Sequence, residues 1–74
     1  MDERNLIKMA NNIGAFFKSE SDREIAIAGI EQHLRNFWEP RMRNQIIDYF
    51  QQDGSELMDI VAQAVNNLAQ SQQC

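Results

Sequence analysis

The stretch His33-Leu-Arg-Asn-Phe-Trp-Glu-Pro-Arg-Met-Arg43 contains the only proline of the 74-residue chain. The residue before a proline is disfavoured in the α-helical region, whereas proline itself suits the first turn of a helix. The stretch therefore predicts one helix that ends near Phe37 and a second helix that begins at Pro40.

The residues before this stretch show helical periodicity over about 22–37 and 5–18. In the segment 22–37, one apolar face is predicted to comprise Ala26, Ile27, Ile30, Leu34 and Phe37. Ser21 and Glu24 have the spacing of a capping box, and Ile25 falls on the polar side, where we expect it to be exposed. Gly29 also lies away from the apolar face, which would let another chain approach.

The segment 5–18 has a similar amphipathic pattern. Its apolar stripe comprises Leu6, Ala10, Ile13 and Phe17, and is widened by Met9, Phe16, Ile7 and Gly14. Lys8, Asn11 and Asn12 lie on the opposite, polar side.

The residues after the proline predict two more helices, over about 40–52 and 55–69. Inward positions of the first are Met42, Ile46, Tyr49 and Phe50. Gly54 fits a left-handed C-cap, and Ser55 fits the N-cap of the last helix. The apolar arc of that helix is broad, so it is either the central core helix or a helix with a second, partner-facing side. We therefore predict an all-α, compact bundle of four short amphipathic helices in one domain, 1–74, ending in a polar tail, 70–74.

The charge of the chain is uneven. The net charge is −4; residues 1–43 carry all seven Lys and Arg against seven Asp and Glu, and residues 44–74 carry four acids without a base. This acidity argues against nucleic-acid binding. No apolar segment is long enough to cross a membrane or to act as a signal peptide, and a single cysteine allows no internal disulfide. These features predict a cytoplasmic protein.

Candidate reactive residues are isolated from one another. His33 is the only histidine and Cys74 the only cysteine, so neither belongs to a metal-ligand set. Ser55 invites comparison with the modified serine of acyl carrier proteins, but Gly54 and Glu56 flank it in place of an Asp-Ser-Leu triplet. We predict no catalytic, cofactor-binding or metal-binding residues in this chain.

The corner stretch offers the best candidate binding surface. Trp and Arg are frequent at interface hot spots. The predicted partner-contacting residues are His33, Phe37, Trp38, Pro40, Arg41 and Arg43. For Trp38, a place in the core at the helix corner is an equally good interpretation.

Two stretches of this sequence resemble a known family. Lys8-Met-Ala-Asn-Asn-Ile-Gly-Ala-Phe-Phe17 and the corner stretch, with its Phe-Trp-Glu-Pro-Arg-Met-Arg run, are similar to the delta subunit of cytoplasmic, NAD-dependent, molybdenum- or tungsten-containing formate dehydrogenases. The resemblance extends from the first helix to the last, although the C-terminal half matches only in helical pattern.

The resemblance implies a non-catalytic accessory subunit that supports assembly or stability of the catalytic alpha subunit. It also implies that partner subunits carry the molybdopterin, the iron–sulfur clusters and the flavin. The alternative is a small self-associating regulatory or adaptor module, which would form a homodimer when isolated.

Overall fold

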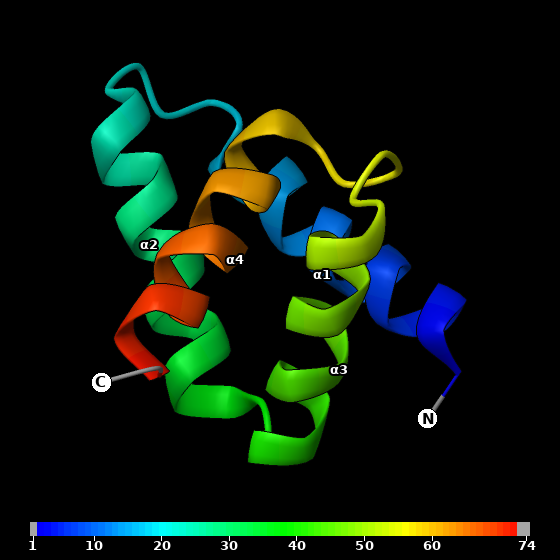
Figure 1. Ribbon diagram of the computed structural model, residues 1–74. Helices are drawn as coiled ribbons and strands as arrows, with labels where there is room; N and C mark the ends of the chain where they lie inside the picture. Colours follow the sequence, from blue (N-terminus) through cyan, green and yellow to red (C-terminus); the bar gives the residue numbers. More distant parts are fainter. Residues whose placement is uncertain (1, 73–74) are drawn as a thin grey trace.

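Four α-helices make up the part of the chain that the computed structural model describes, residues 2–72. They are α1 (Glu3–Phe17), α2 (Arg23–Phe37), α3 (Pro40–Gln52) and α4 (Asp59–Gln72), and residues 2–72 contain no strand. The prediction of an all-α bundle is therefore confirmed. Figure 1 shows α4 lying between α2 and α3, with α1 behind it.

The last helix is the central one: both α4 and α1 pack against each of the other three helices, but α4 contributes the larger number of fully buried side chains. The apolar arc of α4 packs in the core, and its buried side chains are Val61, Ala64, Val65, Leu68 and Ala69. Leu6, Ile30, Leu34 and Ile46 complete the core from the surrounding helices, and all four are fully buried. Of the two roles predicted for the last helix, the structure shows the central core helix.

The second helix begins at a different cap from the one predicted. Asp22, not Ser21, is the N-cap of α2, and its Oδ1 accepts hydrogen bonds from the backbone N–H groups of Glu24 (3.0 Å) and Ile25 (3.4 Å). A carboxylate at this position stabilises the positive end of the helix. The predicted Ser21–Glu24 capping box is therefore wrong by one residue.

The connection between α3 and α4 is longer than predicted. Gly54 has φ +72°, as expected for a residue that ends a helix in the left-handed region. Ser55, however, does not cap α4: its hydroxyl donates to Asp53 Oδ2 (2.9 Å), and α4 begins at Asp59. The helix also continues to Gln72, past its predicted end at about residue 69, and Cys74 lies outside the described residues.

Asn11 explains why residues 55–58 are not helical. Its side chain donates to the carbonyl oxygen of Glu56 and accepts from the N–H of Met58, both at 2.9 Å. Tyr49 adds a third contact, because its hydroxyl accepts from the N–H of Glu56 (2.9 Å). These bonds satisfy backbone groups that a helix would otherwise pair internally. Asn11, placed by the helical pattern on the polar side of α1, thus joins α1 to the α3–α4 connection.

Candidate docking surface

The corner between α2 and α3, residues 37–43, exposes Phe37 and buries Trp38. Phe37, expected on the apolar face of its helix, is 73% exposed, whereas Trp38 is only 6% exposed and belongs to the core. The helix ends at Phe37, and Trp38 has an extended backbone (φ −90°, ψ 137°) that turns its side chain inward. The core interpretation of Trp38 is therefore the one that the structure shows.

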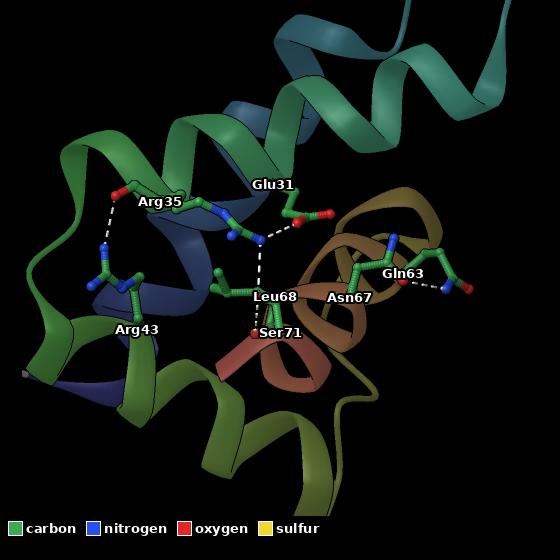
Figure 2. A network of polar contacts seen from close by, with 7 residues as sticks. All are labelled: Glu31, Arg35, Arg43, Gln63, Asn67, Leu68 and Ser71. Carbon is green, nitrogen blue, oxygen red and sulfur yellow. Dashed lines mark hydrogen bonds and ion pairs between the residues drawn. The ribbon is translucent and has the colours of Figure 1, made fainter. Parts of the chain in front are cut away.

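Arg43 closes this corner from α3. Its Nη1 donates to the carbonyl oxygen of Arg35 (2.8 Å, Figure 2) and also to that of Trp38 (3.0 Å), at the end of α2. The last carbonyl groups of a helix lack partners within the helix, and a cation is favourable at that negative end. Arg43 therefore fixes the angle between α2 and α3.

Arg35 joins the same region to α4. Its Nη2 pairs with the carboxylate of Glu31 and donates to Ser71 Oγ (2.9 Å), as Figure 2 shows. The Ser71 hydroxyl in turn donates to the carbonyl oxygen of Leu68 (2.9 Å). Three helices thus meet in one set of polar contacts, which leaves Arg35 and Arg43 engaged within the fold.

An exposed aromatic groove lies between α1 and α2. We define the aromatic groove by its lining residues, Asn12, Ile13, Phe16, Phe17, His33 and Phe37. Phe16 is 77% exposed and contacts Phe17 edge to face, with ring centroids 5.1 Å apart. On the α2 side, the rings of His33 and Phe37 lie 4.7 Å apart. Two large aromatic rings thus flank an open apolar surface of the kind that often marks a protein interaction site.

Gly29 provides the space in which Phe17 packs. A Cβ atom at Gly29 would lie 2.5 Å from Cε1 of Phe17, a distance that no real Cβ contact tolerates. The sequence-based expectation that Gly29 leaves room for another chain is therefore wrong, because α1 of the same chain occupies that room. The ring of Phe17 also lines the aromatic groove beside Gly29, so this glycine shapes the groove indirectly.

The six predicted contact residues divide into two groups. Trp38 and Arg43 are engaged in the corner itself. Phe37 is exposed, His33 is half-buried beside it, and Pro40 and Arg41 are exposed at the first turn of α3. Arg41 has no ion pair among the described residues. The structure therefore leaves Phe37, His33, Pro40 and Arg41 accessible to a partner.

Phe16 is the surface residue that sequence reasoning missed. It was expected to widen the apolar stripe of the first helix, but the buried side of α1 comprises Leu6, Ile7, Ala10 and Gly14, of which Gly14 lies against Val61 on α4. The helical pattern places Phe16 at the margin of the apolar stripe. The position of α4 relative to α1 decides whether a side chain at this margin is buried or exposed. Met9, Ile13 and Phe17 remain partly buried against the core.

Two negative findings concern residues 2–72. This part of the chain has no group of three or more His, Cys, Asp or Glu side chains placed to hold a metal ion. None of its helices has the length and apolar character needed to cross a membrane.

Together, the fold and this surface define a small all-helical protein with an exposed aromatic groove. The model of one protein family, described as NADH-dependent formate dehydrogenase delta subunit FdsD, matches residues 5–65, which is most of the chain. The chain belongs to this family, and it is a delta subunit of an NAD-dependent formate dehydrogenase complex. No curated protein and no solved structure matches it.

Proposed function

We propose that this chain is a non-catalytic accessory subunit that supports assembly or stability of the catalytic alpha subunit of a cytoplasmic formate dehydrogenase by direct contact. The observation that carries the proposal is the exposure of Phe37, at a corner where Arg41 is also exposed and has no ion pair among the described residues, in a chain of this family. A subunit binds other subunits, and a large exposed aromatic side chain is a frequent anchor of such contacts.

The six predicted contact residues take different parts in this proposal. Phe37, His33 and Arg41 contact the alpha subunit directly. Trp38, Pro40 and Arg43 shape the corner that presents them, because Trp38 is buried and Arg43 donates to two carbonyl oxygens of the corner. Burial of an aromatic side chain at an interface removes about 150–250 Å² of surface from water, which is enough to make Phe37 the main anchor.

The chemistry of the complex belongs to other subunits in this proposal. Molybdopterin, iron–sulfur clusters and flavin are held by the partner chains, and formate oxidation takes place in the alpha subunit. A cluster of iron and sulfur needs several thiolate ligands, whereas this sequence has one cysteine, which supports a role without a cluster.

The proposal is tested by expressing the formate dehydrogenase complex with and without this chain. We expect the complex that lacks it to be recovered in lower yield, or to lose formate-dependent NAD reduction faster on heating. The molybdenum content per alpha subunit separates the two roles: a reduced content indicates a role in assembly, and an unchanged content with faster loss of activity indicates a role in stability.

Equal yield, metal content and heat resistance in both preparations would contradict the proposal. Formate oxidation by the isolated chain would contradict its non-catalytic part. The rival role, a self-associating module, predicts a dimer of the purified chain at micromolar concentration, whereas the accessory role predicts a monomer that binds the alpha subunit. Static light scattering distinguishes these outcomes.

A further inference from the structure

We propose that the aromatic groove continues along α1 into a basic groove, and that both together seat one segment of another subunit, with apolar residues at one end and carboxylates at the other. This inference rests on the proposed function, because it specifies the partner chemistry of a docking surface. It extends the surface from the α2–α3 corner to α1, and it adds Phe16, Lys8 and Arg4 to the residues that contact the partner.

The apolar end is the aromatic groove. Phe16 on α1 and Phe37 on α2 are the two most exposed large hydrophobic side chains of residues 2–72. Ile13 and Phe17, half-buried, lie between α1 and α2 and line the same groove. No Asp, Glu, Lys or Arg side chain lines this groove, so an apolar side chain that enters it does not have to displace water from a carboxylate, an ammonium or a guanidinium group.

The basic end lies farther toward the start of α1. We define the basic groove by its lining residues, Arg4, Ile7, Lys8, Asn11, Asn12 and Glu56. Asn12 lines both grooves, so the two grooves adjoin at this residue. Lys8 and Phe16 are eight residues apart on one helix, or about 12 Å along its axis. A partner segment a few turns long therefore reaches both.

The charge of the basic groove is opposite to that of the whole chain. Arg4 and Lys8 have no ion pair among the described residues, and Glu56 is the one acid in the lining. The chain as a whole carries a net charge of −4. Unpaired cations next to an apolar groove are complementary to a partner segment that bears carboxylates. Repulsion between like charges disfavours a partner segment that bears Lys or Arg.

A second copy of this chain matches the required pattern only in part. Its large exposed hydrophobic side chains within residues 2–72 are Phe16, Ile25 and Phe37, all on α1 and α2. Its unbalanced acids lie in residues 44–74, and one of them, Asp59, is paired with Arg23 at 3.2 Å. Since acids such as Glu24 also lie beside these side chains on α2, the choice of occupant rests on the family match, which makes this chain one subunit of a larger complex: the occupant is a segment of a different subunit.

The test measures the affinity of the full-length chain for formate dehydrogenase complex purified without it. Phe16→Ser and Phe37→Ser remove the aromatic rings, and Lys8→Glu reverses one cation. Ile25→Ser is the matched control for an exposed apolar residue, since Ile25 is 56% exposed and lines neither groove. Lys18→Glu is the matched control for charge, because Lys18 is exposed and lines neither groove. Circular dichroism confirms that each variant is folded.

We expect each aromatic variant to raise the Kd about tenfold or more, as for interface hot spots. We expect Lys8→Glu to raise it roughly fivefold in low-salt buffer and less at high salt, because exposed charge pairs are screened. The two controls leave the Kd within about twofold of the unsubstituted chain, the usual range for substitutions outside an interface.

Three results would overturn the inference. If neither aromatic variant binds more weakly than Ile25→Ser, the aromatic groove is not the docking site. If Lys8→Glu behaves like Lys18→Glu, the partner segment is not acidic. If Phe16→Ser abolishes a dimer of the isolated chain, a second copy occupies the groove. Failure of the unsubstituted chain to bind the complex at all contradicts the proposed function instead, so the two failures are distinguishable.

Discussion

Gly14 on α1 lies against Val61 on α4 so closely that a Cβ atom at Gly14 would be 2.3 Å from Cγ2 of Val61. Val61 is fully buried, so its side chain has no free space into which it can move. The close approach of these two helices therefore depends on the absence of a side chain at position 14.

Substitution Gly14→Ala is expected to destabilise the fold. Alanine favours a helix by about 1 kcal/mol over glycine, but overpacking a core costs about 1–3 kcal/mol, and the contact at Val61 is severe. We expect a net loss of about 1–2 kcal/mol in the free energy of unfolding, measured by urea denaturation followed by circular dichroism. A variant more stable than the original chain would show that α1 and α4 are not in close contact.

Asn11 is expected to contribute more to stability than its neighbour Asn12. Asn11→Ala removes two hydrogen bonds to the backbone of Glu56 and Met58 and leaves these groups without their partner. The expected loss is about 1–3 kcal/mol. Asn12→Ala is the matched control, because Asn12 is exposed and is the adjacent residue of the same type. Equal melting temperatures for the two variants would contradict the assignment of Asn11 to the α3–α4 connection.

Phe37 and Trp38 are expected to respond oppositely to truncation. Trp38→Ala leaves a cavity in the core and should cost about 3–5 kcal/mol, which is most of the stability of a domain this small. Phe37→Ala removes a side chain that is 73% exposed and should change stability by less than about 0.5 kcal/mol. Thermal unfolding of both variants checks this. Near-equal losses would mean that Phe37 packs in the core.

Arg43 and Arg41 form a second matched pair, on α3. Arg43→Met removes the two hydrogen bonds to the carbonyl oxygens of Arg35 and Trp38, with an expected loss of about 1–3 kcal/mol. Arg41→Met removes an exposed cation that has no ion pair among the described residues, and should leave stability unchanged within about 0.5 kcal/mol. The opposite order of melting temperatures would contradict the role of Arg43 in the corner.

Local signals in the sequence were sufficient to predict four helices and the break between α2 and α3. Pro40 begins α3 as predicted, Gly54 has the positive φ expected of it, and Ile25 is exposed. Each of these outcomes depends on the residue itself and its near neighbours, because proline restricts its own φ and glycine lacks a Cβ atom.

Features that depend on distant residues were not predictable in this way. Asn11 contacts Glu56 and Met58, which are more than 40 residues away in the chain, and these contacts delay the start of α4. The exposure of Phe16 depends on the side from which α4 approaches α1. The exposure of Phe37 and the burial of Trp38 depend on the backbone turn after α2. Helical periodicity identifies the apolar stripe of each helix. It does not show which edge of that stripe the neighbouring helices bury.

Hydrogen–deuterium exchange of this chain, free and bound to the formate dehydrogenase complex, tests the docking surface most directly. The account predicts added protection on binding in peptides that cover residues 8–17 and 33–41, and little change in residues 59–72, whose apolar side is already buried in the core. Added protection confined to residues 44–72, with no change in α1 and α2, would contradict it.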